Sequence, residues 1–187
     1  RLKSIEKRLP ADAVDLRTDC EGLLNHCDKI INDVRAIAHD LKPAALDALG
    51  LVVATGQIMR EFASLNGIQV EIQIAALQQI KDPTTQVSLF RIFQETLNNI
   101  HKHAQATWVL ISAGREGQKM RITIRDNGRG FSNAPTLITA ARSKGLGLST
   151  MDLRCRMIGG RLDVKSAVES GTQITIWLPC HHRHEGE

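Results

Sequence analysis

A narrow apolar stripe runs through the first 42 residues. Residues 1–9 follow a helical pattern, Pro10 interrupts it, and Asp12 or Asp15 can cap a second helix. From there apolar residues recur at alternating steps of four and three, at Leu16, Cys20, Leu23, Cys27, Ile30, Val34, Ile37 and Leu41. Such a seam is buried against other helices in a coiled coil or a four-helix bundle. Because a two-helix hairpin does not bury the seam by itself, the pattern predicts a homodimer through these helices. The alternative is a helix that packs against its own domain.

The pattern changes after Lys42-Pro43, because the residue before a proline disfavours the helical conformation. Residues 45–65 form a broader amphipathic helix that ends at Asn66-Gly67. Residues 68–74 (IQVEIQI) alternate strictly between apolar and polar, as a half-buried strand does, and residues 84–104 return to the helical period. The remaining predicted elements are strands at 107–113, 119–125, 161–166 and 172–178 and a helix at 148–158.

The order of these predicted elements indicates the fold class. Strands joined by short turns are antiparallel neighbours, and the helices then cover one face of the sheet. We therefore predict an α+β fold, a two-layer α/β sandwich with one sheet face toward solvent, preceded by a helical hairpin. The domains are then 1–42 (hairpin), 43–180 (α/β domain) and 181–187, a histidine-rich tail for which a solvated segment is favoured over a metal-binding one.

Composition and charge narrow the function classes. Of 187 residues, 42% are hydrophobic and 24% charged, and no apolar run is long enough to span a bilayer. The net charge of +4 permits an anionic ligand such as a nucleotide, but no basic cluster alternates with aromatic residues, so nucleic acid is not expected. The four cysteines form no CxxC pair, which favours a reducing, cytoplasmic setting. Because Arg1 already lies in a helical pattern, we expect a piece of a longer protein, with any membrane segment outside this sequence.

The first motif with chemical potential is FQETLNNIHKHA, residues 93–104. Glu95 and Asn99 are four residues apart and share one helical face, with Lys102 and His103 one turn later. The opposite stripe is apolar: Phe93, Leu97, Ile100 and Ala104. An ordinary solvent-facing surface is one interpretation. The other is a magnesium site, because this ion prefers oxygen ligands and is commonly shared with substrate phosphates.

The second motif is Asp126-Asn127-Gly128-Arg129-Gly130, directly after the strand at 119–125. These residues are typical of a turn. Two glycines one residue apart also let a backbone approach a flat ligand, and a carboxylate at a strand end can accept a hydrogen bond from an exocyclic amine such as that of adenine. The motif by itself leaves both interpretations open.

The third motif, Lys144-Gly145-Leu146-Gly147-Leu148, leads into the predicted helix at 148–158. A glycine-rich turn before a helix directs free backbone N–H groups at an anion. It lacks the Gly-Lys-Ser/Thr of a Walker loop and the surrounding unit of a Rossmann fingerprint. The preceding stretch, 132–144, has the composition of a loop that closes over phosphates. Glu169-Ser170-Gly171-Thr172 then makes a tight turn into the last strand.

In this order, the motifs resemble those of the ATP-binding domain that histidine kinases, gyrase, Hsp90 and MutL share, the Bergerat or GHKL fold. The helix motif resembles the N box, DNGRG the G1 box and GLGL the G2 box, over roughly residues 80–180. Within that superfamily, LKPAALDALGL (41–51), QETLNNIHKHAQA (94–106) and GLGLSTMDLRCRMIGGRL (145–162) look like the nitrate/nitrite-sensor and DesK-type sensor histidine kinases.

The resemblance implies roles for individual residues. Asn99 would be the Mg²⁺ ligand, Asp126 would accept the adenine amine, and Glu95, through proton handling, and Lys102 would be catalytic. The implied ATP-binding residues are Asn99, Lys102, His103, Asp126, Gly128, Gly130, Gly145, Leu146, Gly147, Leu148 and Thr172. Gly128 and Gly130 would make room for the base, Gly145 to Leu148 would flank the phosphates, Lys102 and His103 would lie near them, and Thr172 would lie near the adenine.

The implied function is that of the catalytic core of a two-component kinase. It would transfer the γ-phosphoryl of Mg-ATP to a histidine and then to a response regulator. The family's acceptor histidine lies on the first hairpin helix, and residues 1–9 contain none, so we expect it upstream of Arg1 and interpret His39 as an ordinary hairpin residue. The alternatives are another ATPase of the superfamily, a serine kinase of the anti-sigma-factor type, or a dimerising scaffold without catalysis.

Overall fold

The structure is a computed structural model that describes residues 44–132 and 146–180. The chain divides into two compact units, Arg1–Lys42 and Pro43–Glu187, and every described residue belongs to the second. The predicted hairpin with its dimer seam, nearly all of the loop at 132–144, and the tail therefore lie outside the described residues.

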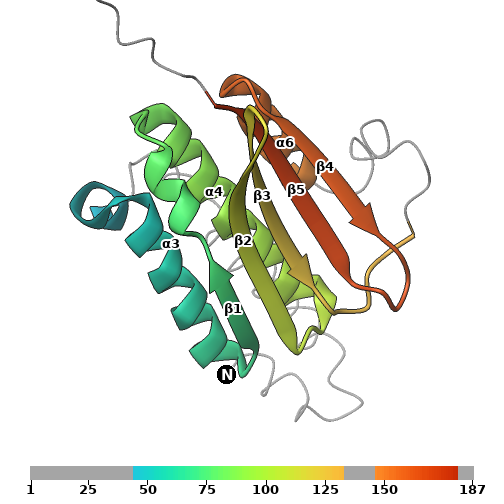
Figure 1. Ribbon diagram of the computed structural model, residues 1–187. Coiled ribbons are helices and arrows are strands. Elements are labelled where there is room, and N and C mark those ends of the chain that lie inside the picture. The colour runs from blue at the N-terminus through green and yellow to red at the C-terminus, as the bar shows by residue number, and fades with distance from the viewer. Residues whose placement is uncertain (1–43, 133–145, 181–187) are drawn as a thin grey trace, which may run out of the picture. The chain divides into compact units, whose positions relative to one another are not determined.

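A five-stranded mixed sheet forms one layer of the domain (Figure 1). Its strands in spatial order are β1 (Gln69–Gln73), β2 (Trp108–Glu116), β3 (Lys119–Asp126), β5 (Thr172–Pro179) and β4 (Arg161–Ser166). The β2–β3 and β4–β5 pairs are antiparallel, as predicted from their short connections. Two pairings were not predicted. β5 lies between β3 and β4, and β1 pairs with β2 in parallel because a helix connects them.

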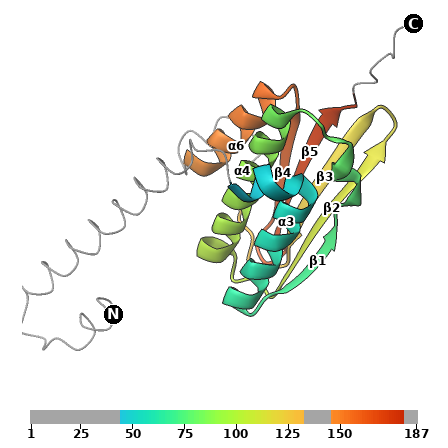
Figure 2. The same ribbon diagram turned by 90° about the vertical axis from the view of Figure 1, so that its left-hand side faces the viewer.

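Three helices form the second layer, and Figure 2 shows them all on one side of the sheet. They are α3 (Ala44–Asn66), α4 (Pro83–Asn99) and α6 (Leu146–Met157). The core lies between the layers, and its largest fully buried side chains include Phe90, Phe93, Met59, Leu77, Ile111 and Ile176. The predicted two-layer α/β sandwich is confirmed. Among the described residues, no helix has both the length and the hydrophobicity needed to cross a bilayer.

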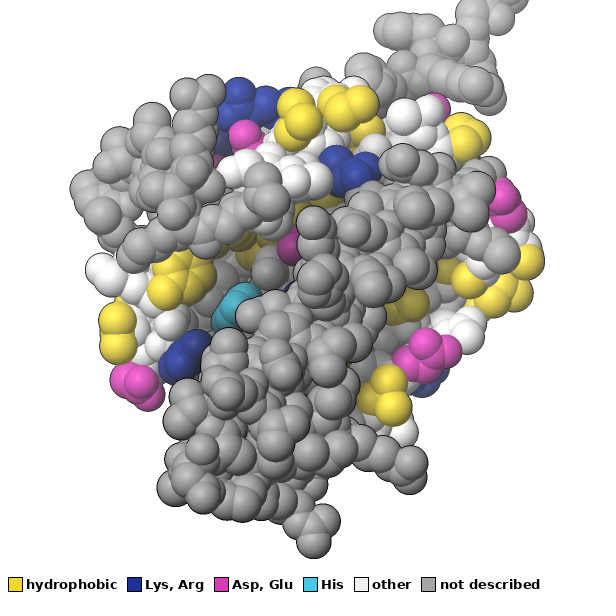
Figure 3. Space-filling model, turned by 180° about the vertical axis from the view of Figure 1, so that it is seen from behind, with side chains coloured by type: hydrophobic (Ala, Val, Ile, Leu, Met, Phe, Trp, Pro, Cys, Tyr) yellow, Lys and Arg dark blue, Asp and Glu magenta, His cyan; other side chains and the backbone are white. Residues whose placement is uncertain are grey.

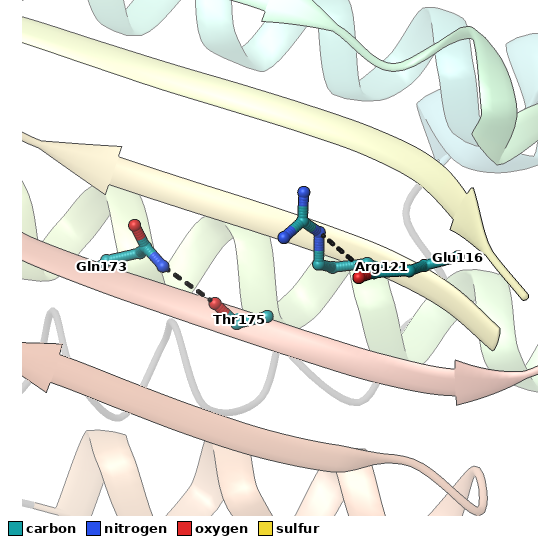
Figure 4. A network of polar contacts seen from close by, with 4 residues as sticks. All are labelled: Glu116, Arg121, Gln173 and Thr175. Carbon is teal, nitrogen blue, oxygen red and sulfur yellow. Dashed lines mark hydrogen bonds and ion pairs between the residues drawn. The ribbon is translucent and has the colours of Figure 1, made fainter.

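The other face of the sheet carries polar side chains. Figure 4 shows the Arg121 guanidinium 3.2 Å from the Glu116 carboxylate, and Gln173 donating a hydrogen bond to the Thr175 hydroxyl at 3.3 Å. Arg121 also lies 6.0 Å from the centre of the Trp177 ring, within the range of a cation–π contact. Because successive side chains of a strand point to opposite faces, β3 and β5 alternate between apolar residues that face the core and mostly polar residues that face outward.

Two local features go beyond the hydrophobic pattern. A short 3₁₀ helix, η1 (Ala75–Gln79), follows β1 and buries Leu77 in the core. α3 is interrupted at Gly50, whose backbone angles (φ 74°, ψ 170°) are almost restricted to glycine. The predicted end of that helix is confirmed, because α3 stops at Asn66 and Gly67 has φ of 65°.

The N-terminus of α4 has a built cap. The Asp82 carboxylate accepts hydrogen bonds from the Thr85 backbone N–H and the Thr85 hydroxyl, both at 2.7 Å, and Pro83 occupies the first turn. These bonds, the hydroxyl first, lower the pKa of Asp82 below its ordinary 3.8. A lowered pKa means that the ionised cap stabilises the fold above the ordinary pKa and loses this effect as the pH falls through the lowered one.

We expect Asp82→Ala to lower the melting temperature at neutral pH, and the difference from wild type to shrink in acid. Thermal unfolding at neutral and at acid pH measures this, with Glu71→Ala, an exposed carboxylate on β1, as a control that should show no such pH dependence. An equal loss of stability at both pH values would contradict the assigned role of the charge.

Candidate functional site

The three motifs meet at one end of the domain, where β3 and α4 end and β5 and α6 begin. Gly147 of α6 lies against the Glu95 carboxylate of α4, with its position for a Cβ 3.6 Å from the Asn99 amide nitrogen. Gly128 lies against Ala104, directly after α4, and Gly171 against the backbone of Asp126. Segments far apart in the sequence therefore surround one site.

On α4, Glu95 and Asn99 are both half-buried and one turn apart. The stripe predicted to be apolar and buried, Phe93, Leu97, Ile100 and Ala104, is indeed in the core. Within the described residues neither the Glu95 carboxylate nor the Asn99 amide makes a hydrogen bond, so both polar groups are available to a ligand.

The predicted helix at 84–104 does not stay α-helical to its end. Its last five residues form a π-helical turn, η2 (Ile100–Ala104), which is wider than an α-helical turn. Lys102 and His103 are therefore displaced from the positions that an α-helix would give them, and both are exposed. The neighbouring His101 lies with its Nδ1 atom 2.5 Å from the Asn66 side-chain oxygen, which ties η2 to the end of α3.

Asp126 is the buried carboxylate of the site, with 3% of its surface exposed. Its Oδ1 atom accepts hydrogen bonds from the backbone N–H of Gly128 at 2.8 Å and of Thr172 at 3.3 Å. In the described part of the chain, Oδ2 has no hydrogen-bond donor. Burial raises the pKa of Asp126 above its ordinary 3.8, and the two N–H bonds oppose that rise. One oxygen thus holds the loop, and the other remains for a ligand.

The other residues of the Asp126–Gly130 motif hold the protein together. The Asn127 side-chain oxygen accepts hydrogen bonds from the N–H groups of Thr107 and Trp108, each at 2.9 Å, so it joins the motif to the start of β2. Arg129 Nε donates to the His103 carbonyl at 2.6 Å. The sequence analysis placed both residues in the motif but gave neither of them a role. A backbone contact of Asn127 could have been predicted, because Asn side chains often bind backbone groups in turns. Its actual partners could not, because they lie about 20 residues away in the sequence.

The glycines of this motif allow close approach of the protein's own backbone. A Cβ on Gly128 would overlap the carbonyl and side chain of Ala104, and one on Gly130, which has φ of 58°, would overlap the Ala167 carbonyl. Their predicted role of making room for a base remains a prediction, but the fold requires glycine at both positions.

The third motif begins α6 at Leu146, two residues before the predicted start. Gly145 lies outside the described residues, and so does the side chain of Leu146. Leu148 is half-buried and packs against the core, so its side chain anchors the helix. Because the first N–H groups of a helix have no partner inside it, a helix start such as that of α6 is a common place for an anion to bind.

Thr172 closes the site from β5. Its hydroxyl lies 3.0 Å from that of Ser166, which also accepts a hydrogen bond from the Phe131 N–H at 2.9 Å. Ser166 was not among the predicted residues. Its contacts connect the strand β4 to the residue that follows Gly130, a relation with no signature in the sequence.

Figure 3 shows the domain from behind, with an imidazole in view beside a basic side chain. The described histidines are His101 and His103, both on η2. Among the described residues, no group of three or more His, Cys, Asp or Glu side chains could hold a metal ion without other ligands.

Comparisons with known proteins place this geometry in a family. The sensor histidine kinase LiaS of Bacillus subtilis (strain 168) is 31% identical over 79% of this chain and 39% of its own length. The sensor histidine kinase MctS of Rhizobium johnstonii is 32% identical over 74% of this chain and 30% of its own. The chain thus spans well under half the length of these relatives, and their names agree with the predicted resemblance to sensor histidine kinases.

Solved structures agree at the level of the fold. The histidine kinase domain of the Erythrobacter litoralis EL346 blue-light activated histidine kinase matches with a TM-score of 0.60 and 18% identity, over 96% of this chain and 90% of that domain. The model of the histidine kinase-, DNA gyrase B- and HSP90-like ATPases matches residues 84–182, which is more than half of the sequence. The chain belongs to this ATPase family, in its histidine kinase branch.

Proposed function

We propose that this domain binds ATP with Mg²⁺ and transfers the γ-phosphoryl group to a histidine on the dimerisation hairpin of the same protein. From there the phosphoryl group passes to a response regulator. One observation carries the proposal. One site is surrounded by a buried carboxylate (Asp126), by the Glu95 carboxylate and Asn99 amide, and by the N-terminus of α6, and within residues 44–132 and 146–180 no hydrogen bond occupies Asp126 Oδ2, Glu95 or the Asn99 side chain.

The adenine would bind at Asp126. Its Oδ2 atom would accept a hydrogen bond from the exocyclic amine, while Oδ1 stays bonded to Gly128 and Thr172. A charged acceptor in a desolvated position gives a strong and selective bond, because a ligand without the donor would leave the carboxylate unpaired. Thr172 lies beside this position through its backbone N–H.

The phosphates would bind at the other end, near Asn99 and the start of α6. The donor set fits Mg²⁺, because the Asn99 amide oxygen is a hard ligand and this ion takes its remaining ligands from phosphates and water. Bound there, Mg²⁺ would neutralise negative charge on the phosphates. The N–H groups of α6 and the cations Lys102 and His103, the latter when protonated, would add to this stabilisation.

In the transfer step, a nitrogen of the acceptor imidazole attacks the γ-phosphorus, and the bond to the bridging oxygen breaks, so that ADP leaves with the bonding electrons. Glu95 would accept the proton that the imidazole loses. Catalysis of this type consists mainly of positioning and electrostatic stabilisation. Gly147 supports this arrangement, because any larger residue there would displace the Glu95 carboxylate.

We expect Asn99→Ala to weaken ATP binding about tenfold when Mg²⁺ is present, because the variant lacks a side chain that would hold the ion. ATP binding with excess chelator should hardly change. Isothermal titration of the 187-residue chain in both conditions measures this, with Asn98→Ala, the adjacent amide on α4, as the control. An equal loss with and without Mg²⁺ would contradict the ligand role.

The test of histidine phosphorylation uses the full-length protein, so that the domain is studied together with the proposed acceptor histidine. Incubation with labelled ATP should give phosphate that is stable in alkali and labile in acid, as expected of phosphohistidine. Acid-stable label would indicate a serine kinase instead, and tight ATP binding without any label would indicate a scaffold. Adding a purified receiver domain should then remove the label.

The partners and the location follow from the same proposal. The homodimer would form through the helices at 1–42, and the domain would work in the cytoplasm, as part of a longer bacterial protein anchored in a membrane, if at all, by segments outside this sequence.

A further inference from the structure

Arg129 connects two parts of the site that have separate tasks in the proposed function. Its Nε atom donates to the His103 carbonyl at 2.6 Å, and its backbone N–H donates to the Ala104 carbonyl at 2.8 Å. These carbonyls belong to the last two residues of η2, the turn that carries Lys102. The Arg129 carbonyl in turn accepts from the Glu169 N–H at 2.7 Å, so the residue is held on both sides.

The contact is physically suited to hold the end of a helix. The last carbonyls of a helix have no partner inside it and carry the negative end of its dipole. A guanidinium that donates to such a carbonyl makes a charge-assisted hydrogen bond and adds a favourable charge–dipole interaction. η2 is followed by Gln105 in the left-handed conformation (φ 54°), so the helix ends there. The Arg129 backbone bond to Ala104 and the contact of His101 with Asn66 also hold η2, while the guanidinium holds the His103 carbonyl.

The base-binding carboxylate does not depend on this guanidinium. Asp126 is held by the N–H groups of Gly128 and Thr172, both backbone donors that a change of the Arg129 side chain leaves in place. Removal of the side chain would therefore break the hydrogen bond to the His103 carbonyl and loosen the part of η2 that carries Lys102 and His103, and it would leave Asp126 where it is.

We infer that Arg129 is a positioning residue that fixes Lys102 and His103 of η2 for the phosphates and so couples the base-binding loop to the phosphate end of the site. This inference rests on the proposed function. It assigns to the fourth residue of DNGRG a role that acts through the helix end and needs no contact with the nucleotide.

The test compares two probes on the 187-residue chain, Mg-ATP by isothermal titration and adenosine by nuclear magnetic resonance shifts. We expect Arg129→Met to weaken Mg-ATP binding about tenfold, because this is roughly the effect of losing one hydrogen bond from a charged group. Adenosine binding should change less than about twofold. Arg129→Lys should recover part of the loss, because an ammonium can still donate to the His103 carbonyl. Arg125→Met, an exposed arginine one residue before Asp126, should bind both probes as wild type does.

A double-mutant cycle separates positioning from a general loss of structure. In a Lys102→Met background, Arg129→Met should cost much less Mg-ATP affinity than in the wild-type background, because the two changes affect one group. Equal losses for adenosine and Mg-ATP, full additivity of the two substitutions, or unchanged Mg-ATP affinity in Arg129→Met would each overturn the inference. If Arg129→Met does not fold, the same comparison is made with Arg129→Lys. A wild-type chain that binds no Mg-ATP would overturn the proposed function itself.

Discussion

Asp126→Asn should reduce ATP affinity about a hundredfold while leaving the empty domain as stable as wild type or more stable. The asparagine oxygen can take the place of Oδ1 and accept from the Gly128 and Thr172 N–H groups. Its NH₂ group then replaces Oδ2 and faces the exocyclic amine of adenine, which is also a donor. Loss of a charge-assisted bond and an unpaired buried donor together cost about 3 kcal/mol of binding free energy, which is roughly a hundredfold.

The expected stability follows from the sign of the pKa shift. Burial raises the pKa of Asp126 in the folded state, so the carboxyl favours folding in acid and this contribution is lost as the pH rises through the raised pKa. At neutral pH the buried charge thus costs stability, and asparagine removes that cost. Thermal unfolding without nucleotide and titration with ATP measure the two quantities on the same sample.

Asp163→Asn provides the matched control, because Asp163 is a half-buried carboxylate on the far strand β4 that pairs with Arg161. It should bind ATP as wild type does. If Asp126→Asn bound ATP with unchanged affinity, the adenine would not lie at this carboxylate.

The ATP affinity of the wild type should also fall as the pH is lowered through the raised pKa of Asp126, and Asp126→Asn should not show this pH dependence.

Gly128→Ala should destabilise the domain by about 2–3 kcal/mol even when no nucleotide is present. The new methyl group would overlap the Ala104 carbonyl and side chain, so backbone segments on both sides must move apart. Overpacking of this kind typically costs about 1–3 kcal/mol. We expect a value in the upper part of this range, because the overlap is partly with backbone, which moves less easily than a flexible side chain. The melting temperature should fall by roughly 5–10 °C.

Gly114→Ala is the control, since a Cβ at Gly114 in β2 has no neighbour within 4 Å and neither glycine has a positive φ. Its melting temperature should stay close to that of wild type. The pair distinguishes two reasons for a glycine in DNGRG. If Gly128→Ala melted as wild type does but lost ATP, the glycine would serve the ligand and not the contact with Ala104.

Local periodicity was sufficient to predict the strands and the α-helices of this domain, but not η1 or the π-helical turn η2. The buried side of each element is indicated by the spacing of a few neighbouring residues. Examples are the alternation in IQVEIQI and the helical spacing of Phe93, Leu97, Ile100 and Ala104. The positions of Asp126 at a strand end and of Gly147 at a helix start were also readable, because turn and helix-start chemistry depends on adjacent residues.

The partners of these residues were decided by the tertiary structure alone. The insertion of β5 between β3 and β4, the π-helical turn that displaces Lys102 and His103, and the contacts of Asn127, Arg129 and Ser166 all join segments that lie far apart in the sequence. Such contacts depend on how whole elements pack, and many sequences satisfy the same pattern with different neighbours. The sequence by itself therefore determined the elements, the two-layer architecture and the residue types of the site, whereas packing decided which groups hold that site together and which remain free for a ligand.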